Sequence, residues 1–280
     1  MGFFSRLFGG KKAQPPELEQ PISHLAFVLL SEPKLPTAEV ILSAFDEFRG
    51  ESEVLTYEPD EESSDEEEDA GSALVLELEG IGMVMVALVP APVPEGEADH
   101  AFDFSMSSFG EDASLGDHRA HLIVTLMGID QVVSPLAGLT AFTSVIAAIA
   151  KAAPAVGVYM GNAGATHAAE FVTSIAGERH VNSRIMLWNG LSRSLESDGR
   201  MSFLSYGMAQ LGLPNLYLIA AADKAGESLG TFFDLLTYVA NRGEPIPEGD
   251  TVGSTEDEHI EVNYVPSPTN DGSTVWRVRL

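Results

Sequence analysis

A long uncharged segment near the middle of the chain constrains the fold most. No residue between Leu136 and Ala150 is charged, and the sequence PLAGLTAFTSVIAAIAKA is nearly apolar on every side of a helix. Ser134 and Pro135 are typical of an N-cap and a first helical residue, and Pro154 ends the helix. Because a helix that is apolar all round offers no face to solvent, we expect it to lie against a sheet or beneath other structure.

Runs of β-forming residues on both sides of this helix supply such a sheet. Unbroken apolar content predicts buried strands at 24–30 and 121–128. The runs ALVLELEG and IGMVMVALV predict a hairpin that turns at Gly80 and Gly82. Further strands are expected at EVLTY (53–57), before Gly161, at RIMLWNG (184–190), RMSFLSYG (200–207) and LYLIAA (216–221), and in a C-terminal pair, HIEVNYV and TVWRVRL, joined by an NDG turn.

The order of these elements predicts the fold class. Other helices are expected at 37–50, at about 167–175, and from 223 or 228 to the glycine at 243. Strands alternate with helices in some places and meet as hairpins in others, which does not fit a doubly wound parallel sheet. We therefore expect an α+β fold with mixed, largely antiparallel sheets, packed helices and two sheet lobes.

Composition divides the chain into three parts. Residues 1–21 are a basic, Phe-rich segment followed by a stiff linker, PPELEQP. Residues 22–95 are expected to form an N-terminal α/β lobe that carries an acidic, disordered insert at about 58–71. Residues 96–280 are expected to form a C-terminal α+β lobe.

The net charge of −27 bears directly on the partners of the chain. An anionic surface gains no counterion release from a phosphate backbone, so nucleic acid is not expected as a partner. Nine of the twelve residues from Glu58 to Asp69 are acidic, and without them the chain still has 33 acids against 15 bases. We interpret this block as a solvated insertion, with contact to calcium or a basic protein as the alternative.

The first twelve residues, MGFFSRLFGGKK, reverse the sign of the charge and contain no acid. If the segment is helical, its large apolar side chains gather on one side while its basic side chains reach lipid headgroups. Two interpretations stay open: weak, reversible membrane association, and a frayed or self-docking terminus. No secretory signal, myristoylation pattern or run of about 18 uninterrupted apolar residues is present. The candidate membrane contacts are Phe3, Phe4, Leu7, Phe8, Lys11 and Lys12.

A glycine-rich stretch, GNAGATH (161–167), resembles a phosphate-binding turn because it follows an apolar run and precedes a predicted helix. The dinucleotide fingerprint needs Gly-x-Gly-x-x-Gly and the phosphate loop needs Lys before Ser or Thr, and neither pattern occurs here. We therefore favour a structural corner in which Thr166 is the N-cap. The alternative is a small anion or ligand at the helix N-terminus. Its candidate binding residues are Gly161, Asn162, Gly164, Thr166 and His167.

The remaining candidate residues do not form a catalytic signature. Trp188 and Asn189 are candidates for the floor of a ligand pocket, although such a Trp is more often a core aromatic. We interpret His167 and Glu170 as a surface pair, because further metal ligands are lacking. No Gly-x-Ser-x-Gly elbow and no cysteine occur, which excludes disulfides and thiol chemistry. We assign no catalytic residue, metal or cofactor and favour a protein that is not an enzyme.

The motifs after residue 121 carry a family resemblance. The ordered set GVYMGNAGATHAAEF, LWNGLS, LSYGMAQLGLPNLYL, FFDLLTYVANRG, GDTVG and YVPSP resembles the bacterial family called domain of unknown function 4261, over roughly residues 121–280. The resemblance implies a cytosolic bacterial protein with a mixed αβ domain. It implies no activity and transfers no catalytic residues.

These observations support two kinds of function. The negative charge, the missing catalytic signatures and the basic N-terminal segment favour a cytoplasmic, non-catalytic protein-interaction or regulatory protein with peripheral contact to the inner membrane. A special case is an immunity or adaptor protein that binds a basic toxin or effector. The alternative is an enzyme or small-molecule binder that uses the Gly161–His167 loop. The sequence does not indicate an oligomeric state.

Overall fold

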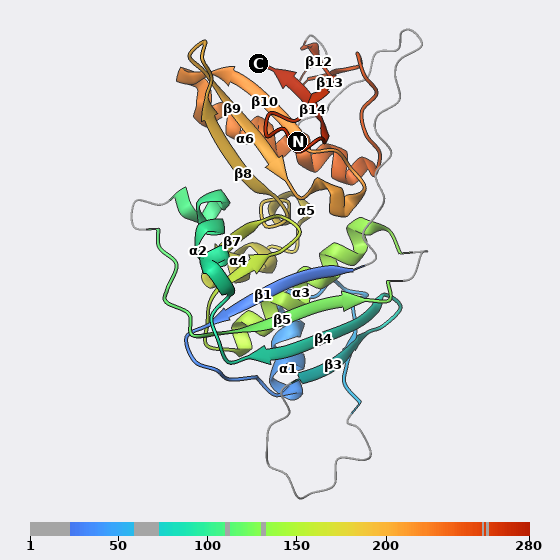
Figure 1. Ribbon diagram of the computed structural model, residues 1–280. Helices are drawn as coiled ribbons and strands as arrows, with labels where there is room; N and C mark the ends of the chain where they lie inside the picture. Colours follow the sequence, from blue (N-terminus) through green and yellow to red (C-terminus); the bar gives the residue numbers. More distant parts are fainter. Residues whose placement is uncertain (1–22, 59–72, 110–112, 130–132, 254, 256–257) are drawn as a thin grey trace, which may run out of the picture. The chain divides into compact units, whose positions relative to one another are not determined.

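The computed structural model describes residues 23–58, 73–109, 113–129, 133–253, 255 and 258–280 (Figure 1). The candidate membrane contacts at residues 3–12 and the acidic stretch at 59–72 lie outside these residues. The chain forms two compact units, which we call the N-terminal unit (22–190) and the C-terminal unit (191–280). The sequence instead suggested a boundary after residue 95, and the strand order explains the difference.

An antiparallel sheet of seven strands forms the centre of the N-terminal unit. Its order is β2-β3-β4-β5-β1-β6-β7, and every neighbouring pair is antiparallel. Strand β5 lies between β4 and β1, so a division after residue 95 would cut through one continuous sheet. The strands are β1 (His24–Leu30), β2 (Leu55–Thr56), β3 (Ala73–Leu78), β4 (Gly82–Val89), β5 (Ala120–Met127), β6 (Ala155–Met160) and β7 (Ala165–Ala168).

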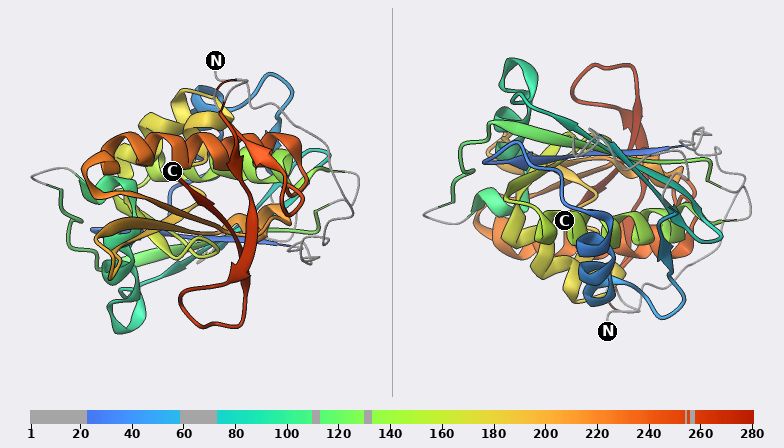
Figure 2. Two further views of the ribbon diagram at one scale, coloured as in Figure 1. Left: turned by 90° about the horizontal axis from the view of Figure 1, so that it is seen from above. Right: turned by 90° about the horizontal axis from the view of Figure 1, so that it is seen from below.

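Helices cover one face of this sheet: α1 (Ala38–Phe48), α3 (Pro135–Ala152) and α4 (Ala169–Gly177). Figure 2 shows α1 and α3 on the same side of the strands. As predicted, α3 begins after Ser134, whose Oγ accepts a hydrogen bond from the Ala137 amide (3.2 Å). By length and composition α3 is able to cross a membrane, but 67% of it is buried within the structure, as in the core helix of a folded domain.

A buried arginine joins the C-terminal ends of α1 and α4 to the middle of α3. Arg184 closes the short helix α5 (Val181–Arg184) and is 1% exposed. Its guanidinium donates hydrogen bonds to the carbonyl oxygens of Phe48 (2.9 Å), at the end of α1, and of Ala176 (2.9 Å), in the last turn of α4. It also donates to the Thr140 carbonyl (2.7 Å) and to Ser144 Oγ (3.1 Å), both on α3. Partly negative carbonyls at the C-terminal ends of α1 and α4 thus stabilise the guanidinium, and the charge of the nearby Glu53 carboxylate adds to this.

On the opposite face of the sheet, the described residues cover part of the width. Short helical turns over residues 94–109 pack on β1 and β6, where Leu29, Val93, Ala98, Ala101 and Tyr159 form a core cluster. The same segment occupies the outer edge of β7, because the Ala168 amide donates to Ser107 Oγ (3.1 Å). The turns are η1 (Pro94–Gly96), α2 (Glu97–His100), η2 (Ala101–Phe104) and η3 (Met106–Phe109).

The C-terminal unit contains a mixed sheet of five strands in the order β13-β14-β10-β9-β8. Strands β10 and β14 are parallel, whereas the β9–β10 and β13–β14 pairs are antiparallel. Helix α6 (Ala225–Arg242) packs on β10 and ends at Gly243, which has φ 70° as expected of a helix stop. The other elements are β8 (Gly190–Leu195), β9 (Arg200–Tyr206), η4 (Met208–Leu211), β10 (Leu216–Ala221), η5 (Ala222–Lys224), β11 (Thr251–Val252), β12 (Ile260–Glu261), β13 (Asn263–Pro266) and β14 (Thr274–Arg279). The α+β class with more than one sheet is confirmed.

Two local predictions are wrong. The helix expected from about residue 167 begins at Ala169, because residues 165–168 pair with β6 as strand β7. Thr166 is therefore a strand residue and not an N-cap. RIMLWNG is not a strand, since α5 ends at Arg184 and β8 begins only at Gly190. Short apolar runs do not distinguish a strand from a buried turn by periodicity alone.

Candidate functional site

The GNAGATH stretch is the turn and second strand of a β-hairpin. Strand β6 ends at Met160, and the Gly164 amide donates to the Met160 carbonyl (2.9 Å) to close the turn. Gly164 has φ +58°, a left-handed conformation that favours glycine. Because α4 begins only at Ala169, residues 161–167 do not provide the helix N-terminus on which the anion-binding alternative depended.

The side chains of this hairpin lie in packed structure. Thr166 and His167 are 0% exposed, and His167 stacks on Phe171 with ring centroids 5.7 Å apart. The surface pair expected for His167 and Glu170 is therefore wrong, since His167 is a core residue. Burial lowers the pKa of His167 to about 4, and the nearby Leu187 carbonyl opposes this shift only in part. Neither ring nitrogen makes a hydrogen bond of normal geometry with the described residues.

Trp188 and Asn189 lie beside the hairpin but also belong to the core. They are 0% and 1% exposed. Trp188 Nε1 donates to Thr143 Oγ1 on α3 (2.8 Å), and Asn189 Nδ2 donates to the Ile185 carbonyl (3.1 Å). The structure thus brings the predicted site residues together by close packing. That they bind a ligand stays a prediction, and the hollows described below are lined by other side chains.

Close packing at this corner predicts the effect of one added methyl group. A Cβ atom at Gly190 would lie 2.5 Å from the carbonyl oxygen of Ala163, which is backbone and does not yield easily. Gly190→Ala is therefore expected to lower the free energy of unfolding of the N-terminal unit by about 1–3 kcal/mol. Urea unfolding followed by Trp188 fluorescence measures the change. The control is Gly177→Ala, where nothing lies within 4 Å of the added atom, and equal midpoints for the two variants would contradict the expectation.

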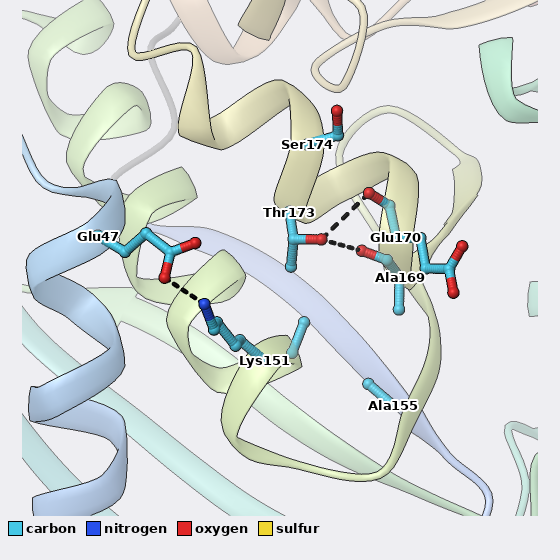
Figure 3. A pocket seen from close by; sticks show the side chains of 8 residues that line it. Glu47, Lys151, Ala155, Ala169, Glu170, Thr173 and Ser174 are labelled. Carbon is cyan, nitrogen blue, oxygen red and sulfur yellow. Dashed lines mark hydrogen bonds and ion pairs between the residues drawn. The ribbon is translucent and has the colours of Figure 1, made fainter.

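A hollow of about 410 Å³ lies between α1, α3 and α4 and is drawn in Figure 3. The Lys151 ammonium contacts the Glu47 carboxylate, so the two charges neutralise each other. Thr173 Oγ1 donates to the carbonyl oxygens of Ala169 and Glu170 (3.1 Å each). The side chains of Glu170 and Ser174 point away from Lys151. Since no histidine lines the hollow to activate the Ser174 hydroxyl, the arrangement does not form a nucleophile and base pair.

The histidines near β5 have structural partners. His118 Nε2 accepts a hydrogen bond from the Val93 amide (3.2 Å), and its Nδ1 lies 3.7 Å from Asp99 Oδ1. His121 Nδ1 lies 2.8 Å from the Ala91 carbonyl oxygen. These contacts hold the segment that leads into η1 against the sheet. Among the residues described, no group of three or more His, Cys, Asp or Glu side chains is placed to hold a metal ion.

Part of the seven-stranded sheet, which no described segment covers, carries exposed apolar side chains. Cross-strand register places Val75 opposite Met85 and Met85 opposite Thr125, so these side chains share one face. Val75 is 50% exposed, Met83 41% and Met127 40%. We call this surface the open face and define it by Val75, Glu77, Met83, Met85, Ala87, Ile123, Thr125 and Met127. These residues belong to strands β3, β4 and β5, which are labelled in Figure 1.

The open face is suited to binding another protein. Contiguous exposed apolar side chains mark interaction sites on soluble proteins. The flexible thioethers of Met83, Met85 and Met127 adapt to partners of different shape. Sequence reasoning missed this site. The only signal for it was that IGMVMVALV is apolar on both faces, a pattern that normally predicts cover on both sides.

The chain segment that contains β2, β3 and β4 has charge of one sign. Between Arg49 and Arg119 the chain contains 20 Asp and Glu residues and no Lys or Arg. This stretch includes β2, β3 and β4, and Glu77 is the one charged side chain of the open face. An apolar surface inside an acidic stretch of chain favours a partner that is both apolar and basic.

Comparison with known proteins finds one family match, which lies in the C-terminal unit. Residues 204–279 match the family model DUF4261, a domain of unknown function. The chain resembles DUF4261 there. This confirms the resemblance for the motifs from LSYGMAQLGLPNLYL to YVPSP, while its extension to residues 121–203 stays a prediction. No curated protein and no solved structure matches the chain.

The DUF4261 region contains its own hollow of about 420 Å³ at the N-terminal end of α6. Lys224 and Arg279 line it together with Glu227 and Glu258, so the lining has charges of both signs. Ser228 is buried, but its hydroxyl donates to the Lys224 carbonyl (2.9 Å). Among the described residues that line this hollow, none offers a buried polar group that is free to select a ligand. The open face lies in the N-terminal unit and outside the DUF4261 match.

Proposed function

We propose that this protein is a non-catalytic, cytoplasmic protein-interaction protein whose open face binds a basic, apolar segment of a partner. The observation that carries the proposal is the exposure of Val75, Met83 and Met127, at 40–50%, on a sheet that is otherwise well covered. Contact of residues 3–12 with the inner membrane is a separate part of the proposal and rests on the sequence alone.

The chemistry of the partner follows from the surface. Its apolar side chains bury the methionines of the open face, and its Lys or Arg side chains meet a stretch of chain that has no base between Arg49 and Arg119. Charges of opposite sign raise the association rate and select against acidic partners. A basic toxin or effector protein is one class of partner that meets this description, which makes an immunity or adaptor role the special case of the proposal.

A labelled peptide of alternating Lys and Val residues is a suitable probe for this surface. We expect Met83→Lys and Met127→Lys to weaken its binding about tenfold each, because each change places a like charge on the apolar contact. The matched control is Leu195→Lys, which changes the net charge equally at a side chain that is 66% exposed in the C-terminal unit. Fluorescence anisotropy at increasing salt measures the affinity.

Salt concentration and the charge of the peptide provide two further tests of the proposal. The affinity of the Lys and Val peptide is expected to fall as salt rises, because screening weakens contacts between exposed charges. A matched peptide of Glu and Val is expected not to bind. Equal binding of both peptides, or equal weakening by the control at Leu195, would contradict the proposal.

A further inference from the structure

We propose that the partner segment binds as an added β-strand along the free edge of β3. This inference rests on the proposed function and specifies the backbone geometry of the complex. Edge strands with unpaired amide and carbonyl groups are templates for strand addition, in which the backbone provides affinity and alternate side chains provide specificity.

The edge of β3 is free over half of its length among the described residues. Strand β2 pairs only with Leu78 and Glu77 of β3. The Glu79 amide donates to the Val54 carbonyl (3.0 Å), which shows that odd-numbered residues direct their backbone groups toward β2. Because this direction alternates along a strand, Val75 and Ala73 direct their amides and carbonyls to the same side, past the end of β2. A strand bound there continues the hydrogen-bonding line that β2 begins.

The side chains of such a strand fit the open face. Val75 points to that face, so one side chain of the bound strand lies beside it, while Thr56 of β2 lies beside Glu77. An apolar side chain covers Val75, which is half exposed, and a long Lys or Arg side chain reaches Glu77 diagonally. Residues 73–76 contain neither Pro nor Lys, the residues that commonly protect an edge from pairing.

Charge decides between a foreign segment and a second copy of this chain. Pairing two β3 edges would bring together two copies of a strand whose one charged side chain is Glu77. Like charges in close apposition disfavour that pairing, whereas a basic segment is attracted. The other edge of the sheet is not available in the same way, because the Ser107 hydroxyl already accepts from the Ala168 amide on β7. We therefore assign the edge of β3 to a basic segment of another protein.

Val75→Pro tests the backbone contact directly. Proline removes the outward amide of residue 75 but none of the bonds from β3 to β4, and edge positions tolerate it. The residue before it, Leu74, is already in a strand, as a residue before proline prefers. We expect the affinity for the Lys and Val peptide to fall about tenfold in Val75→Pro. Val75→Thr, which keeps the amide, is the control and is expected to change the affinity only about twofold.

A second measurement uses the unchanged protein and does not depend on how the variant folds. A Lys and Val peptide methylated at every second backbone nitrogen cannot donate along one edge, and we expect it to bind about tenfold more weakly. Hydrogen exchange at the Val75 amide is expected to slow when the unmodified peptide is bound. If methylation and Val75→Pro leave the affinity unchanged while Met83→Lys weakens it, strand addition is overturned and the proposed function stands. If Met83→Lys also has no effect, both fail.

Discussion

Replacing Arg184 by methionine is expected to lower the free energy of unfolding of the N-terminal unit by about 3–5 kcal/mol. The guanidinium donates to the carbonyls of Phe48, Ala176 and Thr140 and to Ser144 Oγ, and the charge of the nearby Glu53 carboxylate also favours its charged form. Methionine fills part of the same space but donates nothing. Buried acceptors from three helices would lose a donor at once, and each unsatisfied group costs about 1–3 kcal/mol.

The two tryptophans make this effect measurable in one unit, because Trp188 lies in the N-terminal unit and Trp276 in the C-terminal unit. In a Trp276→Phe background, urea unfolding followed by fluorescence reports on Trp188 alone. Arg179→Met is the matched control: Arg179 also donates to a carbonyl at the end of α1, that of Glu47 (2.7 Å), but from an exposed position. We expect the control to cost less than about 1 kcal/mol. Similar losses of unfolding free energy in the two variants would show that the stabilising effect of Arg184 does not depend on its burial.

Mild acid is expected to destabilise the N-terminal unit through its buried histidines. Burial lowers the pKa of His24 and of His167 from 6.5 to about 4. His24 is 2% exposed and stacks on Phe142 with centroids 5.8 Å apart. Unfolding releases both side chains to take up protons at their ordinary pKa. The free energy of unfolding is therefore highest above pH 6.5. It falls as the pH decreases from 6.5 toward 4, by about 3 kcal/mol for each of these two histidines.

Urea midpoints of Trp188 fluorescence between pH 7 and pH 4 measure this loss. His167→Leu removes one of the buried histidines whose pKa is lowered, the others being His24 and His121, so we expect the loss of stability between pH 7 and pH 4 to shrink by about 3 kcal/mol while the stability at pH 7 changes little. His180→Leu, at an exposed position before α5, is the control and is expected to leave the pH dependence unchanged. An unchanged slope in His167→Leu would mean that this histidine titrates alike in the folded and unfolded chain.

Elements with a strong local signal were predicted well from the sequence. The strand at 24–30 is unbroken in apolar content, the β3–β4 hairpin has glycines at its turn, and α3 has a serine cap and a proline at its first position. In each case the residues that determine the element lie within it. Helix α4 and the run RIMLWNG were different, because pairing with β6 and burial beneath α3 decided them. The position of β5 between β4 and β1 is likewise set by distant residues, and so the unit boundary was not predictable from composition.

The candidate site depended still more on distant residues. An apolar strand face is a core when a neighbouring segment covers it and an interaction surface when none does. Val93, Ala98 and Ala101 cover β1 and β6, but no described segment does so for Met83 and Met127. Sequence reasoning identified glycines and aromatic residues at 161–189 as the place to look, because motifs are local. The open face has no motif and becomes visible only when the strand order is known.

The central place of β1 in its sheet has a consequence for synthesis on the ribosome. Its partners β5 and β6 begin at residues 120 and 155, so the strand emerges long before either neighbour exists. At ordinary translation speeds the delay is on the order of ten seconds. During that interval seven residues of strand-forming sequence, HLAFVLL, depend on chaperones or transient collapse to avoid aggregation.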